Sequence, residues 1–171
     1  MTDLFRALRP HQWIKNLLVF AGPVFSLRMF DVEAMTTASL TFLLFCAAAS
    51  SVYLFNDIRD RDRDRLHPKK RHRPIAAGRL SVGLATAASV ALGAGAIAGA
   101  FLLGPAGLGW LFVAYLVMQL AYTLKLKEVP IVDALIVAIG FVMRAVSGAI
   151  AIEVTISTWL LICTTFFALF I

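Results

Sequence analysis

Residues 34–74 read AMTTASLTFLLFCAAASSVYLFNDIRDRDRDRLHPKKRHRP, an apolar stretch that runs directly into a dense cluster of charge. The apolar part, 34–55, is long enough to cross a bilayer as a helix. A cluster of both charge signs is costly to hold at the end of a membrane helix. The stretch therefore predicts a membrane protein whose chemistry lies where the helix meets the charged loop.

The composition extends this membrane assignment to the whole chain. Of the 171 residues 60% are hydrophobic, and the mean hydropathy of +0.84 excludes an ordinary soluble domain. Because backbone polar groups in lipid must pair within their own segment, each apolar run is predicted to be a helix. We expect an all-α, polytopic transmembrane bundle in a single membrane domain, 1–171. Its six helices are expected at roughly 14–30, 34–55, 82–103, 107–124, 130–152 and 157–171.

Positive charge alternates between successive loops. Nine of the 16 Lys and Arg residues lie between Arg59 and Arg79. Basic loops stay in the cytoplasm, which places the N-terminus and the loops 56–81 and 125–129 on that side of the plasma membrane. A patch between membrane spans faces headgroups or phosphates rather than nucleic acid.

Some features of the apolar segments are structural. Pro23 is expected to bend the first helix. The glycines at 93, 95 and 99 are expected to allow close helix packing. The sequence ends at Ile171 inside an apolar run, so we expect a piece of a longer chain; whether the protein forms a homo-oligomer stays open.

Three carboxylates in the charged loop follow helical spacing. Asp57, Asp60 and Asp64 fall within roughly 60° of one another on a helix. Mg²⁺ prefers oxygen ligands, often completed by phosphate oxygens, and Asn56 adds a neutral oxygen. The pattern predicts a metal site on Asp57, Asp60 and Asp64. The alternative is a solvated helix with ion pairs along RDRDRDR, and for Asp62 we favour that reading.

Basic residues that could hold phosphate stand in three places. Lys69, Lys70, Arg71 and Arg73 follow the aspartates, and they could equally anchor a cytoplasmic loop. His67 and His72 lack a nearby third nitrogen or sulfur ligand for a metal. The other basic and polar candidates are Lys15 and Asn16, beside the interfacial Trp13, and Tyr122, Lys125 and Lys127 at the end of the fourth span.

The fifth span carries two charged residues, Asp133 and Arg144. They lie three turns apart and therefore share one face of the helix. Arg144 is roughly 20 Å from the start of the span at 1.5 Å per residue, where contact with lipid is costly. We expect it on the wall of a polar cavity, either holding a phosphate or bracing carbonyl groups.

Together these motifs resemble the UbiA-type intramembrane prenyltransferase superfamily. The resemblance lies in NDxxDxxxD at Asn56–Asp64, HPxKRxRPIAAG at His67–Gly78, RPxQWxKN at Arg9–Asn16 and YLVMQLAYTLKLKEVPIVD at Tyr115–Asp133. It is closest to the decaprenyl-phosphate phosphoribosyltransferase branch. The second aspartate-rich motif of the aromatic prenyltransferases, DxxxD, is incomplete because Val137 follows Asp133.

The resemblance implies a bundle of nine helices, of which this chain supplies six. It also implies Mg²⁺-dependent transfer of a 5-phosphoribosyl group from phosphoribosyl diphosphate to a polyprenyl phosphate, for the synthesis of cell-envelope polysaccharide precursors. Asp57, Asp60 and Asp64 would be the catalytic, metal-binding residues. The substrate-binding residues would be Lys15, Asn16, Asn56, Lys70, Arg71, Arg73, Tyr122, Lys127 and Arg144.

Other functions stay open. Prenyl transfer from a prenyl diphosphate to an aromatic or other small acceptor is the nearest alternative. A transporter should carry breaks and charges within its spans, and here only Pro23 and Arg144 have that character. A purely structural subunit leaves the carboxylate spacing unexplained.

Overall fold

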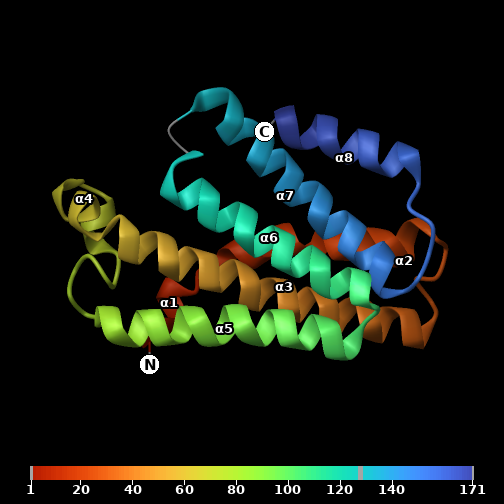
Figure 1. Ribbon diagram of the computed structural model, residues 1–171, viewed down its shortest axis with the longest axis horizontal. Coiled ribbons are helices and arrows are strands. Elements are labelled where there is room, and N and C mark those ends of the chain that lie inside the picture. The colour runs from red at the N-terminus through yellow and green to blue at the C-terminus, as the bar shows by residue number, and fades with distance from the viewer. Residues whose placement is uncertain (1, 127–128, 171) are drawn as a thin grey trace.

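The regular structure is entirely helical over the part of the chain that the structure describes, residues 2–126 and 129–170. It is a computed structural model (Figure 1). The helices are α1 Thr2–Ala7, the 3-10 helix η1 Pro10–Phe20, α2 Ala21–Phe25, α3 Val32–Arg59, α4 Arg61–Leu66, the 3-10 helix η2 Lys70–His72, α5 Val82–Leu103, α6 Ala106–Leu124, α7 Pro130–Ala151 and α8 Thr158–Phe170. The predicted all-α fold is confirmed.

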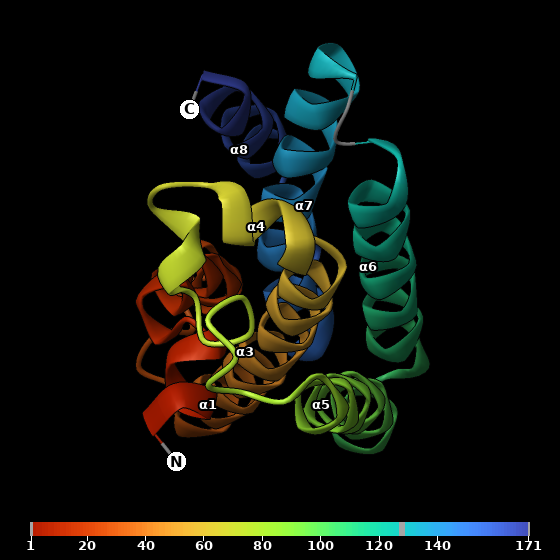
Figure 2. The same ribbon diagram turned by 90° about the vertical axis from the view of Figure 1, so that its left-hand side faces the viewer.

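Helix α3 is the centre of the bundle. Its first turn is capped by Asp31, whose side chain accepts hydrogen bonds from the backbone N–H groups of Glu33 and Ala34. Seen along the bundle, η1, α5, α6 and α7 surround it (Figure 2). Buried small residues such as Ala38, Ala48 and Ala49 let the neighbouring helices approach it closely.

Within the described residues, four helices are long and apolar enough to cross a membrane: α3, α5, α6 and α7. The predicted bounds of these four lie within a few residues of the observed ones. The segment predicted at 14–30 differs, because it is a 3-10 helix that changes to the short helix α2 at Ala21. Pro23 stands in the first turn of α2, where its missing N–H is tolerated, so the break precedes it. The last segment forms α8, a helix of 13 residues.

Glycines mark the closest helix crossings. A Cβ on Gly148 would lie 1.8 Å from the carbonyl oxygen of Val19, so η1 crosses α7 in backbone contact. The predicted packing role of glycines in α5 holds at Gly93 and Gly99, which face side chains of α3. It is wrong for Gly95, where a Cβ would meet no described atom within 4 Å.

The core between the spans contains packed aromatic side chains and a pair of interhelical hydrogen bonds. Phe45 of α3 packs on Phe112 and Tyr115 of α6, with ring centroids 4.4 and 5.2 Å away. The Ser51 hydroxyl donates to the Ser89 carbonyl and the Ser89 hydroxyl to the Ser51 carbonyl, both at 2.8 Å. These reciprocal hydrogen bonds join α3 to α5 inside the membrane.

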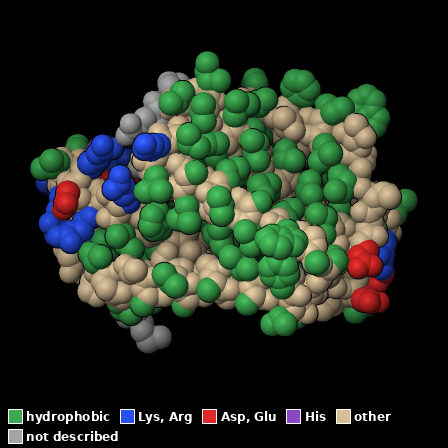
Figure 3. Space-filling view, in the orientation of Figure 1, with side chains coloured by type: hydrophobic (Ala, Val, Ile, Leu, Met, Phe, Trp, Pro, Cys, Tyr) green, Lys and Arg blue, Asp and Glu red, His purple; other side chains and the backbone are tan. Residues whose placement is uncertain are grey.

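The two ends of the bundle differ in charge, as Figure 3 shows, and an apolar belt lies between them. Arg79 donates to Asp3 at 3.0 Å, so the N-terminal helix and the basic loop lie at the same end. Ile75 and Leu80 are buried against Ala7 and Leu54, which fixes this loop to the bundle. The N-terminal helix and the loop 56–81 therefore lie at one end, and the end of α6 lies there too, because Tyr122 and Lys70 line the same cavity.

Candidate functional site

The aspartate motif lies across a joint between two helices. Helix α3 ends at Arg59, and Asp60 leads directly into α4. The N–H of Asp60 still donates to Asn56 O at 2.9 Å, and that of Asp64 to Asp60 O at 2.8 Å. The helical spacing predicted for the carboxylates is thus largely kept, although the helix is not continuous.

A cavity of about 460 Å³ opens at this joint, between α3, α4 and α6. Five predicted site residues line it: Asn56, Asp60, Asp64, Lys70 and Tyr122. The other lining residues are Arg9, Val52, Tyr53, Arg63, Gln119 and Thr123. Carboxylate, amide, hydroxyl and basic groups converge here in an otherwise apolar protein.

Asp57 is not among the lining residues; it is buried behind the cavity, with 2% of its surface exposed. Its Oδ1 accepts hydrogen bonds from Arg9 Nη2 at 2.5 Å and from Arg73 Nη1 at 3.1 Å. The same nitrogen of Arg73 donates to Asp64 Oδ2 at 2.7 Å. Arg73 therefore bridges the first and last aspartates of the motif, and the buried charge of Asp57 is compensated by two guanidinium groups.

The oxygen atoms on the cavity wall suit Mg²⁺. Asn56, Asp60 and Asp64 all reach the cavity, and a hard divalent cation takes amide and carboxylate oxygens. Over residues 2–126 and 129–170, no three His, Cys, Asp or Glu side chains come close enough to hold a metal by themselves. The predicted set of Asp57, Asp60 and Asp64 therefore does not form a complete metal cluster by itself, because Asp57 is turned to Arg9 and Arg73. A Mg²⁺ ion at this wall would need waters or phosphate oxygens to complete its shell.

Asp62 behaves as predicted from the sequence, and His67 has a structural role that the sequence did not predict. Asp62 is exposed and lies 3.6 Å from Arg65, an ion pair on a solvated surface. His67 Nδ1 accepts hydrogen bonds from the backbone of Lys69 and Lys70 at 3.2 and 3.3 Å. These two hydrogen bonds cap the turn, so the His67 side chain has a structural role. Arg71 is exposed at the rim of the same end.

Arg144 lies deeper and is not among the residues that line the cavity. Its guanidinium donates to Asn16 Oδ1 at 2.7 Å, Gly140 O at 2.5 Å and Tyr115 Oη at 3.0 Å. Its Cζ lies 5.8 Å from the ring centroid of Phe45. These neutral partners join η1, α6 and α7, so the geometry is that of a brace. Asn16 belongs to this buried network, whereas Lys15 is exposed next to it.

Tyr122 connects the cavity wall to α7. Its hydroxyl donates to Asp133 Oδ1 at 2.8 Å. Asp133 is thus engaged by a side chain of α6, and Val137, one turn on, offers no oxygen ligand. Lys127 lies outside the described residues.

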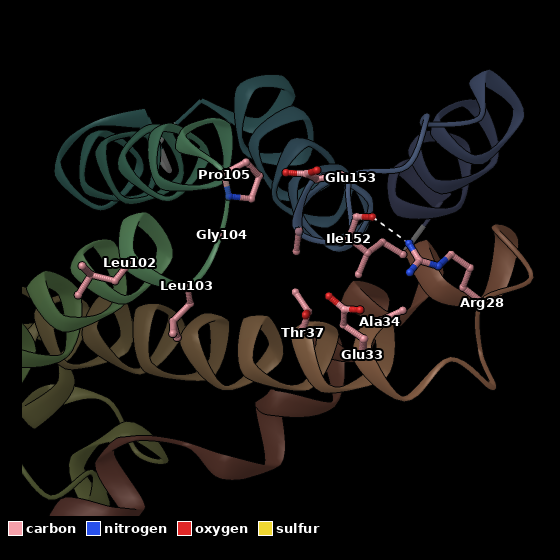
Figure 4. Close-up of a pocket in the computed structure, with 11 residues that line it drawn as sticks. Arg28, Glu33, Ala34, Thr37, Leu102, Leu103, Gly104, Pro105, Ile152 and Glu153 are labelled. Atoms are coloured by element: carbon pink, nitrogen blue, oxygen red, sulfur yellow. Dashed lines mark hydrogen bonds between the residues drawn. The ribbon is translucent and has the colours of Figure 1, made fainter.

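A larger cavity, about 720 Å³, lies at the opposite end of the bundle (Figure 4). Glu33, Thr37 and Glu153 contribute polar groups to it, and Arg28 donates to Ile152 O at 3.2 Å. No aspartate of the motif is near it. We take the smaller cavity as the candidate active site because chemistry depends on the groups present rather than on volume.

Sequence reasoning missed five polar side chains of the candidate site: Arg9, Tyr53, Arg63, Gln119 and Thr123. The spacing of Tyr53, Asn56 and Asp60 places all three on one face of α3 and its C-terminal end. Gln119 and Thr123 are likewise four apart in an apolar span. Polar residues at helical spacing within a span were the available signal.

The fold and the cavity together define a polytopic membrane protein with a charged site at the end of its helices. Residues 17–171 match the model of the UbiA prenyltransferase family. The chain belongs to that family.

Similar sequences and similar solved structures support this family assignment. The chain is 43% identical over 99% of its length to a decaprenyl-phosphate phosphoribosyltransferase of Mycobacterium tuberculosis, and 40% identical over 98% to one of Corynebacterium glutamicum. It spans about half of these relatives, 57% and 51% of their lengths. A UbiA homologue from Archaeoglobus fulgidus bound to DMAPP and Mg²⁺ superposes with a TM-score of 0.82. That pair is 22% identical, with 98% of this chain and 60% of the other covered, a likeness that establishes the fold.

Proposed function

We propose that the protein of which this chain is a part transfers a 5-phosphoribosyl group from phosphoribosyl diphosphate to a polyprenyl phosphate of the decaprenyl type. The observation that carries the proposal is the identity of 40–43% to phosphoribosyltransferases over nearly the whole chain. The product would be a lipid-linked precursor for cell-envelope polysaccharides.

The residues at the cavity support this chemistry. Asn56, Asp60 and Asp64 would hold Mg²⁺, which neutralises charge on a diphosphate as it leaves. An oxygen of the acceptor phosphate bonds to C1 of the ribose as the bond from C1 to the diphosphate breaks, and pyrophosphate is released. Because the acceptor is already anionic, a strong general base is not required.

The other predicted roles remain part of the proposal. Asp57 would act on the metal site, either directly or through Arg73, and Lys70 and Arg73 would hold phosphate. We also propose substrate contacts for Lys15, Arg71, Tyr122 and Lys127. The sequence also suggested substrate contacts for Asn16 and Arg144, but these two side chains are buried and bonded to each other, so we assign them a bracing role instead.

The expected membrane is the plasma membrane, with the N-terminus and the end that carries the cavity in the cytoplasm. Cysteine labelling from either side of intact cells tests this orientation. The oligomeric state can be measured by light scattering on the detergent-solubilised protein.

The test of function uses the full-length protein in membranes with labelled phosphoribosyl diphosphate and decaprenyl phosphate. We expect a labelled lipid, formed in a reaction that a chelator stops and Mg²⁺ restores. Asp64→Asn should lower turnover by more than about 100-fold, as expected for loss of a metal ligand. Asp62→Asn is the matched control, because Asp62 is solvated, and should leave turnover within about twofold.

A different donor would overturn the proposal. If the protein consumes only a labelled prenyl diphosphate, it is a prenyltransferase of the same family. Flux of a substrate without bond formation in proteoliposomes would identify a transporter instead.

A further inference from the structure

Arg9 enters the candidate site from a part of the chain far from the aspartate motif. It lies between α1 and η1 in a left-handed backbone conformation, with φ 55° and ψ 60°. Its Nη2 donates to Asp57 Oδ1, and its Cζ lies 4.9 Å from the ring centroid of Tyr53. The side chain lines the same cavity as Asn56 and Asp64.

Contacts of the N-terminal segment hold Arg9 in this place. The Ser50 hydroxyl of α3 donates to the Leu8 carbonyl at 3.0 Å and accepts from Trp13 Nε1 at 3.0 Å. These contacts lie on both sides of Arg9 in the sequence. The guanidinium is therefore presented to the cavity by a segment tied to the central helix.

If Arg9 engages a ligand, the charge of Asp57 is still compensated, because Arg73 also donates a hydrogen bond to it. A guanidinium has five N–H donors, and the hydrogen bonds recorded over the described residues use only Nη2 of Arg9. Donors of Arg9 thus remain for an anion in the cavity, where Lys70 adds a second positive charge. Guanidinium groups bind phosphate in a planar, bidentate manner.

The two candidate donor substrates differ in their charged groups. A prenyl diphosphate has one anionic end, whereas phosphoribosyl diphosphate has a diphosphate at C1 and a phosphate at C5. The oxygen-rich wall of Asn56, Asp60 and Asp64 suits a metal-bound diphosphate. A second phosphate needs a separate cationic group.

We propose that Arg9, held by Asp57, binds the 5-phosphate of the donor and so selects donors with a second phosphate. This assignment rests on the proposed function. It makes Arg9 a specificity-determining residue and Asp57 its positioning residue.

The experiment compares phosphoribosyl diphosphate with ribosyl diphosphate, which lacks the 5-phosphate, as donors for the full-length protein. The wild type should prefer the phosphorylated donor by about 10- to 100-fold in kcat/KM, as expected for a charge-assisted hydrogen bond. Arg9→Gln should abolish most of that preference by raising KM for phosphoribosyl diphosphate alone. Arg6→Gln, an exposed arginine of the same segment, is the matched control and should keep it.

A binding measurement complements the kinetics. Ribose 5-phosphate should raise the Tm of the wild type and of Arg6→Gln but not that of Arg9→Gln. If Arg9→Gln does not fold, Arg9→Lys keeps the charge and should show a reduced preference, because lysine lacks the planar fork.

The outcomes separate the two proposals. Equal losses with both donors, or an unchanged preference, would show that Arg9 only compensates the charge of Asp57, and would overturn this inference. A wild type that uses neither ribosyl donor would instead refute the proposed function itself.

Discussion

Replacing Gly148 with alanine should destabilise the bundle at the crossing of η1 and α7. The added Cβ would lie 1.8 Å from Val19 O, and ordinary contact begins near 3.4 Å, so one backbone must move by about 1.6 Å. Overpacking of this kind costs about 1–3 kcal/mol, and a backbone atom cannot rotate away as a side chain can. Alanine returns up to about 1 kcal/mol of helix propensity. The expected net loss is about 2 kcal/mol, or roughly 4–8 °C in Tm.

Gly95→Ala is the matched control for this substitution. Gly95 also lies inside a long helix, but its Cβ would meet no described atom within 4 Å. This variant should be as stable as the wild type or more stable by up to about 1 kcal/mol. Thermal unfolding of both variants in the same detergent is the measurement. A Gly148→Ala variant with the same Tm as Gly95→Ala would refute the close crossing of η1 and α7.

Three further changes test the charged groups. Arg144→Lys should lower Tm, since one ammonium cannot replace three guanidinium contacts, while KM for the donor in the surviving protein stays within about twofold; a raised KM with unchanged Tm would indicate phosphate binding. Asp57→Asn leaves Arg9 and Arg73 without their shared carboxylate and should cost about 3–5 kcal/mol in unfolding experiments, as for a broken buried pair. The Arg28 side chain, followed by the N–H of Ala34, lowers the pKa of Asp31 in the folded protein. The ionised Asp31 carboxylate therefore stabilises the fold fully at pH values above its pKa in the unfolded chain. This stabilisation is lost as the pH falls through its pKa in the folded protein. Tm measured below pH 4 should therefore fall less in Asp31→Asn than in the wild type.

The long spans could be predicted from the sequence because hydropathy and length determine them directly. The segment 82–103 coincides with α5, and 34–55 falls within α3. The first apolar segment could not be predicted in the same way, because apolar composition does not distinguish a 3-10 helix from an α-helix. Its path depends on the close crossing at Gly148, a contact between segments far apart in the sequence.

The site was predictable where its residues share one stretch of chain. Helical spacing correctly placed Asp60 and Asp64 at one cavity and Asp62 in solvent. Spacing could not show that α3 ends at Arg59, nor that Asp57 is turned to two arginines. Arg9 was missed because it reaches Asp57 across 48 positions of sequence.

The reciprocal hydrogen bonds between Ser51 and Ser89 bear on how the protein assembles during synthesis. Sliding α3 against α5 by one turn, about 5.4 Å, would break both bonds in surroundings where water cannot replace them. The two spans α3 and α5 follow each other in the chain, so these hydrogen bonds can form in a helical hairpin before α6 is synthesised. The aspartate motif spans the end of α3 and the start of its connection to α5, so the position of the motif relative to α5 would be set before α6 docks.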